Sequence, residues 1–241
     1  MTPSLPPKPQ SELVRLELTR LPRLTLGRKL ARRLLKWLLR LVVWLCTRSS
    51  VSGLENVPRT GPALVVINHL GDADPVIGLA LSPVLFEVVA KMELYELPLM
   101  GALMEAYGVI WIHRGQPDRR ALRAILDGLQ EGRLVALAPE GRESLSGSLE
   151  EGTSGAAFLA LKANAPVLPV TLTGTENECI YGNLRRLRRT PITLTVGPPF
   201  YLEPLADRKQ ALEEGTRKIM LALARQLPPK YRGAYRYGME Q

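Results

Sequence analysis

The stretch VVINHLGDADPV, residues 65–76, joins the end of an apolar run to the predicted start of a helix. Its first three residues are β-branched, as residues of buried strands often are. Asp74 followed by Pro75 is typical of a helix N-terminus, with the carboxylate at the cap and the proline in the first turn. A strand that leads directly into a helix predicts an α/β fold, in which the polar residues between the two lie where such folds usually carry their chemistry.

The same alternation continues along the chain. Short apolar runs predict strands at residues 63–67, 86–90, 109–112, 134–138, 167–172 and 192–197. Segments with helical periodicity lie at residues 75–82, 97–107, 118–130, 154–163 and 206–226. Strands that alternate with helices predict a mostly parallel sheet flanked by helices on both faces.

The composition is that of a folded protein, because 46% of the 241 residues are hydrophobic and 23% are charged. This length suits one α/β domain with an addition. The two cysteines, Cys46 and Cys179, belong to no CxxC pattern or Cys/His cluster. Neither a disulfide framework nor a metal site is therefore predicted.

The net charge of +9 is located in the first fifty residues. They contain eleven Lys or Arg and only two acidic residues, whereas the remaining 191 residues contain 21 basic and 21 acidic ones. A neutral body with a basic segment predicts contact with an anionic surface. We expect the proline-rich residues 1–25 to be a disordered or poorly ordered arm, residues 49–228 to be the folded domain and residues 229–241 to be a tail.

Residues 26–46, LGRKLARRLLKWLLRLVVWLC, predict an amphipathic helix with leucines on one face. On another face basic residues recur every four positions, at Arg28, Arg32, Lys36 and Arg40. The uninterrupted apolar run is much shorter than the roughly 20 residues that a spanning helix needs. We therefore expect residues 26–48 to lie in a membrane interface, with the cations paired to anionic headgroups. The alternative is a helix that packs on its own domain and leaves its charged face in water.

His69 and Asp74 are separated by five positions, which on a regular helix would place them about 140° apart. However, His69 precedes the helix, and Gly71 gives the loop freedom to fold the imidazole over Asp74. A carboxylate on one ring nitrogen leaves the other nitrogen as a general base. The pattern indicates a His-Asp dyad; the alternative is that Asp74 only caps the helix and His69 is structural.

Further polar residues follow neighbouring predicted strands. Arg114 follows the strand at 109–112, and Glu140 and Arg142 follow the strand at 134–138. Because parallel strands end at one edge of a sheet, these side chains can converge with His69. Arginine at such a position recognises phosphate or carboxylate. The other histidine, His113, is expected to be structural from the alternation of its strand.

Together these residues resemble the motifs of the PlsC-like glycerophospholipid acyltransferases, the family typified by lysophosphatidate acyltransferase. The first motif, N-H-x-x-x-x-D, is similar to Asn68, His69 and Asp74. The second, G-x-x-aromatic-I-x-R, is similar to Gly108, Trp111, Ile112 and Arg114. The third, F-P-E-G-T-R-S, matches Pro139, Glu140, Gly141 and Ser144, and the fourth, V/I-P-V, matches Pro169 and Val170. The motifs keep the family's order over about residues 52–175.

The resemblance implies transfer of an acyl group from acyl-CoA or acyl carrier protein to the free hydroxyl of a lysophospholipid, above all lysophosphatidate, giving phosphatidate. His69 would be the base and Asp74 would orient it. The residues implied in substrate binding are Asn68, Arg114, Glu140, Gly141 and Arg142. No cofactor or metal is implied beyond the thioester co-substrate. The partner would be a phospholipid membrane surface, on whose cytoplasmic face residues 26–48 would hold the acyltransferase domain.

The third motif departs from the family pattern, because Arg142 and Glu143 follow Gly141 where the family usually has Thr-Arg. Either Arg142 turns inward as the substitute or the acceptor is not lysophosphatidate. For Glu140, a bracing role through backbone N–H groups is as compatible with the pattern as direct substrate contact.

Two rival functions use the same features. A lipid hydrolase could use the dyad to activate water, although GTSGA at residues 152–156 lacks the final glycine of a G-x-S-x-G nucleophile elbow. A non-catalytic protein that binds lipid at a membrane surface would need only the basic helix. Nucleic acid is not an expected partner, because leucine and tryptophan interleave the basic charges and no known nucleic-acid-binding motif follows.

Overall fold

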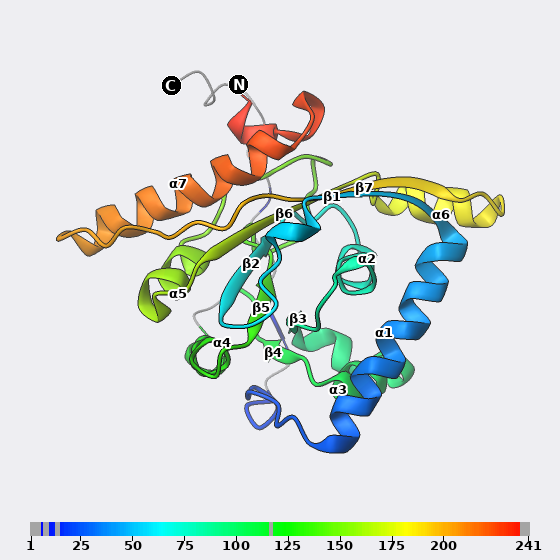
Figure 1. Ribbon diagram of the computed structural model, residues 1–241, viewed down its shortest axis with the longest axis horizontal. Coiled ribbons are helices and arrows are strands. Elements are labelled where there is room, and N and C mark those ends of the chain that lie inside the picture. The colour runs from blue at the N-terminus through cyan, green and yellow to red at the C-terminus, as the bar shows by residue number, and fades with distance from the viewer. Residues whose placement is uncertain (1–5, 7–9, 13–14, 116–117, 237–241) are drawn as a thin grey trace.

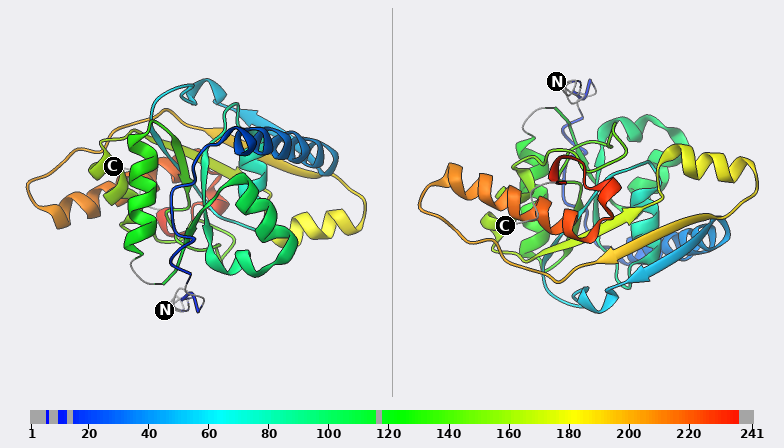
Figure 2. Two further views of the ribbon diagram at one scale, coloured as in Figure 1. Left: turned by 90° about the horizontal axis from the view of Figure 1, so that it is seen from below. Right: turned by 90° about the horizontal axis from the view of Figure 1, so that it is seen from above.

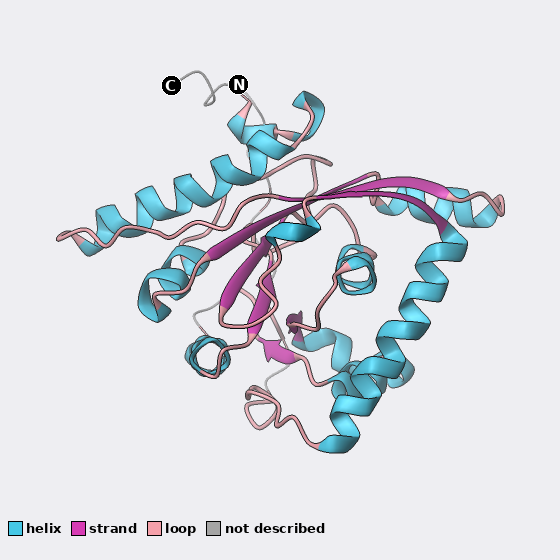
Figure 3. Ribbon diagram, in the orientation of Figure 1, coloured by secondary structure: helices cyan, strands magenta, loops and turns pink. Residues whose placement is uncertain are grey.

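The computed structural model describes residues 6, 10–12, 15–115 and 118–236, which form a central sheet with helices on both sides (Figures 1 and 3). The strands are β1 Thr47–Ser52, β2 Ala63–Ile67, β3 Glu87–Lys91, β4 Ile110–Ile112, β5 Leu134–Leu137, β6 Val167–Thr173 and β7 Thr190–Val196. The α-helices are α1 Leu26–Cys46, α2 Asp74–Leu81, α3 Pro98–Tyr107, α4 Arg119–Gln130, α5 Gly155–Ala163, α6 Asn177–Arg185 and α7 Arg208–Gln226. Short 3-10 helices are η1 Leu54–Asn56, η2 Met92–Glu96, η3 Pro229–Tyr231 and η4 Gly233–Tyr235.

The strand order in the sheet is β1-β7-β6-β2-β5-β3-β4. Every neighbouring pair is parallel except β6 and β7, which are antiparallel. The predicted α/β fold with a mostly parallel sheet is therefore confirmed. Strand β2 lies at the centre of the sheet. Its residue Leu64 pairs with Val135 of β5 on one side and with Val167 of β6 on the other. The loop that leaves β2 consequently begins in the middle of the sheet.

Successive residues of β2 pack on opposite faces of the sheet, as the pleat of a strand requires. Leu64 and Val66 join a buried cluster with residues of α4, α5 and α7. Ala63 and Val65 join a second cluster with residues of α1, α2 and α3. Figure 2 shows these two layers of helices from two further sides. Burial on both faces explains why β2 is apolar throughout its length.

The predicted strands and helices of the domain lie within two residues of the observed bounds. Strand β1 and helix α6 were not predicted. Strand β1 has the polar sequence TRSSVS, with Thr47 as its one fully buried residue, and pairs only with β7. Helix α6 has no buried residue. Both elements lie at the margin of the fold, where burial imposes no apolar periodicity.

Helix α1 packs on the body through its basic face, which is the reverse of the predicted orientation. The Arg32 side chain is buried, with 3% of the residue exposed, and its guanidinium makes two hydrogen bonds to the Glu87 carboxylate, one of them 2.8 Å long. Its Nε donates to the carbonyl oxygen of Tyr107 at 2.7 Å. A buried arginine needs such a partner, because an unpaired buried charge is very costly.

Two more cations of this face bind carbonyl groups near the end of α2. Lys36 Nζ donates to Val84 O at 2.7 Å, and Arg40 Nε donates to Ala80 O at 2.8 Å. Burial, followed by the charge of Arg40, lowers the pKa of Lys36 to about 8. The prediction that Arg32, Lys36 and Arg40 pair with lipid headgroups is therefore wrong. The alternative is confirmed in that the helix packs on its own domain, but the face that packs is the charged one.

The opposite face of α1 exposes its apolar side chains. These are Leu26, Leu30, Leu34, Trp37, Leu38, Leu41, Val42, Trp44 and Leu45. A contiguous apolar surface of this kind marks contact with a membrane or with another protein. Within the described residues, no helix combines the length and the apolar character that crossing a membrane requires.

Both ends of the described chain contact the body. Ser11 N donates to Arg114 O at 2.9 Å, so part of the arm predicted over residues 1–25 is placed against β4. At the other end Tyr231 is buried, and the packed domain continues beyond residue 228 through η3 and η4. Residues 1–5, 7–9, 13–14 and 237–241 of the predicted arm and tail lie outside the described residues.

Candidate active site

His69 lies in the loop between β2 and α2, with its ring against Asp74. His69 Nδ1 is 3.0 Å from Asp74 Oδ2. The same carboxylate oxygen accepts the backbone N–H groups of Leu70 at 2.6 Å and Gly71 at 2.9 Å. The Asp74 side chain is 1% exposed and the His69 side chain is 25% exposed. The carboxylate therefore fixes the ring through Nδ1, and Nε2 is the nitrogen left for proton transfer.

Asp74 is the first residue of α2 and does not occupy the predicted capping position, which belongs to Ala73. Its carboxylate turns back toward the preceding loop, where the N–H groups of Leu70 and Gly71 point at it. Charge-assisted hydrogen bonds of this kind are strong. Asp74 therefore does not cap α2; its carboxylate holds the loop and the ring of His69 in place.

The pKa of His69 is raised above its usual value of 6.5. Burial alone would lower this pKa, and it is the largest single effect. The hydrogen bond and charge of Asp74, together with the charges of Glu143 and Glu140, outweigh burial. The surroundings therefore favour the imidazolium, which is the state that a general base reaches after it has taken a proton.

Glu140 and Asn68 brace the strand ends around His69. The buried carboxylate of Glu140 accepts the N–H groups of His69 at 3.0 Å and Glu150 at 2.8 Å. Burial raises the pKa of Glu140 to about 7, against the lowering effect of these hydrogen bonds. The buried amide of Asn68 both donates to and accepts from the backbone of Leu172. Asn68, predicted to bind substrate, thus has its amide engaged with β6.

Arg142 does not turn toward His69. Its Nε donates to Glu150 Oε2 at 2.7 Å, and its Nη1 donates to Pro6 O at 2.7 Å. The preceding Gly141 has a φ of 74°, in the left-handed region that favours glycine, so the chain turns sharply here. The inward turn of Arg142, one of the two alternatives that the third motif left open, is not observed, because the buried carboxylate of Glu150 holds the guanidinium.

We expect Arg142→Met to destabilise the protein by about 3–5 kcal/mol, because it leaves Glu150 buried without its cation. Thermal unfolding should show a clear fall in Tm. The double variant Arg142→Met/Glu150→Gln should recover much of the loss, and Arg225→Met, at an exposed position of α7, should match the wild type. Equal Tm values for Arg142→Met and the wild type would contradict this assignment.

Arg114 is half-buried just beyond β4. Its backbone N–H donates to the Ser11 hydroxyl at 2.8 Å. Its Nε is buried and has no hydrogen-bond partner in the part of the chain that the structure describes. A buried guanidinium nitrogen without a partner is costly, so Arg114 is suited to receive an anionic group.

A second histidine–aspartate pair has the same five-residue separation. His113 Nδ1 is 2.7 Å from Asp118 Oδ2, and His113 Nε2 accepts the N–H of Arg15 at 3.2 Å. The His113 side chain is 2% exposed. Both ring nitrogens are occupied and shielded from solvent, which fits the structural role predicted for His113.

Asn177, at the start of α6, links the loop of His69 and Asp72 to the loop that carries Glu143. Asn177 Oδ1 accepts the N–H of Asp72 at 3.0 Å, and Asn177 Nδ2 donates to Glu143 Oε1 at 2.7 Å. Sequence analysis missed Asn177 because these contacts join residues 105 and 34 positions apart. No local pattern near residue 177 signals them.

An apolar cavity of about 110 Å³ lies between α2 and the sheet, with His69 and Asp74 in its lining. Residues of β2, β5 and β6, such as Val65, Ala136 and Val170, line it, and Gly78 contributes from α2. The dyad thus combines a partly exposed imidazole with an apolar space beside it, an arrangement suited to a substrate with a hydrocarbon part.

Comparisons with known proteins match this chain to acyltransferases. The family profile described as Acyltransferase matches residues 48–173. A 1-acyl-sn-glycerol-3-phosphate acyltransferase of Borreliella burgdorferi is 28% identical over 142 residues, which cover 58% of this chain and 57% of that protein. A chloroplastic 1-acyl-sn-glycerol-3-phosphate acyltransferase of Arabidopsis thaliana is 31% identical over 154 residues, 59% of this chain and 43% of that protein. The chain spans about half the length of these curated relatives.

A solved structure has a similar fold. The crystal structure of the 1-acyl-sn-glycerophosphate acyltransferase PlsC from Thermotoga maritima matches with a TM-score of 0.64. The match covers 84% of each chain at 23% sequence identity. At that identity the likeness concerns the fold alone.

Proposed function

Because this chain belongs to the acyltransferase family, we propose that it transfers an acyl group from a thioester to the free hydroxyl of a lysophospholipid. One observation carries the proposal: a partly exposed imidazole, held by a buried carboxylate, lines an apolar cavity. Lysophosphatidate is the first acceptor to consider, because the names of the curated relatives specify it. Since Glu150 holds Arg142, the phosphate of this acceptor would have to bind at Arg114 instead. The donor would be acyl-CoA or acyl carrier protein.

The reaction follows from the geometry of the dyad. Nε2 of His69 removes the proton of the acceptor hydroxyl, and the oxygen attacks the carbonyl carbon of the thioester. The tetrahedral intermediate collapses, the C–S bond breaks, and the departing sulfur takes the proton from the imidazolium. Asp74 stabilises the imidazolium in between. The acceptor oxygen is itself the nucleophile, so no covalent enzyme intermediate is required.

Different parts of the site are candidates for binding the hydrocarbon chain and the anionic headgroup of the substrates. The apolar cavity suits a hydrocarbon chain, which leaves the reacting carbonyl near His69. Arg114, with its unpartnered buried Nε, is our candidate for an anionic headgroup. Arg142 is no longer a candidate, because Glu150 holds it. Glu140 and Gly141 would act through the shape of the loop.

Filling the cavity should change the preference for the donor. A Cβ atom added at Gly78 would meet Ile67 Cδ1 at 3.6 Å, an ordinary contact, whereas a longer side chain would extend further. We expect Gly78→Leu to lower kcat/KM for a long-chain acyl donor by about tenfold relative to a short-chain donor, because space for one methylene in a hydrophobic pocket is worth about 1–3 kcal/mol in kcat/KM. Gly78→Ala is the matched control and should behave like the wild type. Equal losses with both donors would argue against the cavity as the acyl site.

The apolar outer face of α1 supports a membrane-associated protein that lies on the bilayer. In this arrangement the leucine and tryptophan side chains contact lipid, and the cations hold the helix to the domain. We propose the cytoplasmic face of a membrane as the location.

The function is tested by acyl transfer from a labelled long-chain acyl-CoA, and from the matching acyl carrier protein, to a panel of lyso-acceptors in detergent. Label in a diacyl product with one preferred acceptor is the expected result. Consumption of the donor without any acceptor would indicate a hydrolase. No reaction with either donor, together with intact vesicle binding, would leave a non-catalytic lipid-binding protein.

A further inference from the structure

Residues 181–189, here named the α6 tip, comprise the end of α6 and the turn that leads to β7. Figures 1 and 2 show α6 extending from the body at the same end of the molecule as the C-terminal end of α1. No residue of α6 is buried. The proposed reaction uses nothing in the α6 tip, so its composition needs another explanation.

The α6 tip exposes large apolar side chains. They are Tyr181, Leu184 and Leu187. Leu187 is 94% exposed and has a φ of 51°, a left-handed conformation that costs free energy for a residue with a side chain. Because this leucine is not buried in the protein, no burial within the protein offsets the free-energy cost of its conformation. Its position therefore favours a contact outside the protein.

Arginines surround these apolar side chains. Arg185, Arg186, Arg188 and Arg189 are all exposed. Among the ion pairs of the described residues, none includes an arginine of the α6 tip. Uncompensated positive charge beside exposed leucine and tyrosine complements an anionic surface with an apolar interior.

The α6 tip is continuous with the apolar face of α1. The guanidinium of Arg189 lies over the Trp44 ring, 5.8 Å from its centre. Arg189 Nε also donates to Thr47 O at 2.8 Å, which ties the tip to the end of α1. Trp44 and Leu45 are exposed at this end. The two apolar surfaces can therefore contact one bilayer together.

We propose that the α6 tip is a membrane contact that binds anionic phospholipid beside the apolar face of α1. Arg185, Arg186 and Arg188 pair with headgroup phosphates, and Leu184 and Leu187 enter the acyl boundary.

The opposite end of α6 reaches the candidate active site. Asn177 holds the loops of Asp72 and Glu143, and a Cβ atom at Gly71 would lie 2.5 Å from Thr175 O. The close packing at Gly71 means that α6 and the His69 loop are fixed together. A bilayer held at the α6 tip therefore has a defined position relative to His69; this step rests on the proposed function.

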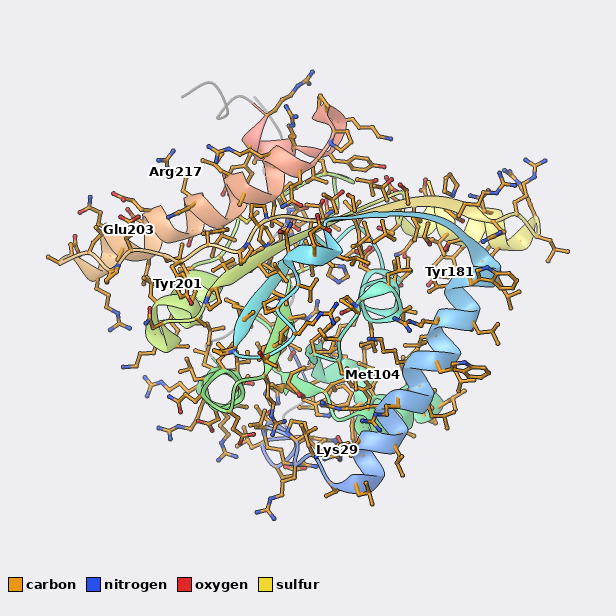
Figure 4. The ribbon with its side chains drawn as sticks, in the orientation of Figure 1. Lys29, Met104, Tyr181, Tyr201, Glu203 and Arg217 are labelled. Carbon is orange, nitrogen blue, oxygen red and sulfur yellow. The ribbon has the colours of Figure 1, made fainter. Side chains whose placement is uncertain are left out.

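The test is binding of the full-length protein, without acyl donor, to vesicles of phosphatidylcholine with or without phosphatidylglycerol. The variant is Arg186→Gln/Leu187→Asn/Arg188→Gln, in which asparagine suits the left-handed conformation of residue 187. The control, Arg217→Gln/Arg225→Gln, removes the same charge from exposed positions of α7. Figure 4 shows Arg217 on the other side of the molecule from Tyr181.

We expect the α6 variant to bind anionic vesicles at least about tenfold more weakly than the wild type, given roughly fivefold for each arginine. The difference should shrink in vesicles without phosphatidylglycerol, and the control should bind like the wild type. Equal binding of the α6 variant and the wild type would overturn the proposal and leave another protein as the partner. The α6 variant should keep the wild-type rate on acceptor in detergent. A wild type that binds as expected and transfers no acyl group would refute only the proposed function.

Discussion

His69→Ala is expected to lower the rate of acyl transfer by about 10²–10⁴-fold, which is the usual contribution of a positioned general base. The variant removes the imidazole whose Nε2 would accept the hydroxyl proton, and no other histidine is placed to replace it among the described residues. The loss should appear in kcat and not only in KM, because the base acts in the transition state. Single-turnover transfer of labelled acyl groups measures it.

His113→Ala supplies a matched control, because His113 belongs to a histidine–aspartate pair with the same separation. The His113 ring is buried and bonded at both nitrogens, so its removal should lower Tm while leaving the folded fraction active. His69→Ala should retain a wild-type fold by circular dichroism. Acyl transfer at the wild-type rate in His69→Ala would falsify the assignment of the base.

Asp74→Asn should reduce kcat/KM and move its dependence on pH. The reaction needs the neutral imidazole, so kcat/KM of the wild type should rise with pH through the pKa of His69, which lies above 6.5, and level off at higher pH. The variant loses the charge and the carboxylate hydrogen bond that raise this pKa, while the burial that lowers it remains. The acid limb of the profile should therefore shift to lower pH, with a lower plateau.

This shift separates two roles of Asp74. The carboxylate also accepts the N–H groups of Leu70 and Gly71, so its replacement perturbs the loop as well as the ring. A purely structural effect would lower the plateau without moving the acid limb. An unchanged limb, measured over a range in which the variant remains folded, would therefore contradict the electrostatic role of Asp74.

The orientation of α1 shows how tertiary contacts override a sound sequence pattern. Periodicity correctly identified residues 26–46 as an amphipathic helix. It does not say which face is inward, because that depends on what the body offers. Glu87 of β3 offers a buried carboxylate 55 positions from Arg32, and carbonyl groups near the end of α2 receive Lys36 and Arg40. These partners draw the cations inward and leave the leucines outside.

The same reason explains the site residues that sequence analysis misplaced. Arg142 was one of the residues that could converge with His69, but the Glu150 carboxylate holds it. Asn177 carried no signal at all, since its partners are Asp72 and Glu143. Each outcome depends on which distant group lies within hydrogen-bond reach, and that is a property of the assembled sheet.

The sequence by itself determined the alternation of strands and helices and the pairing of His69 with Asp74. Both follow from short-range physics: apolar periodicity reports burial along one element, and five residues with a glycine between them suffice to fold a ring onto a carboxylate. Only the tertiary structure decided which face of α1 is inward, where Arg142 points and how α6 meets the site. Those outcomes rest on polar groups brought together from distant strands and loops, where the low polarity of the interior makes a hydrogen-bonding partner decisive.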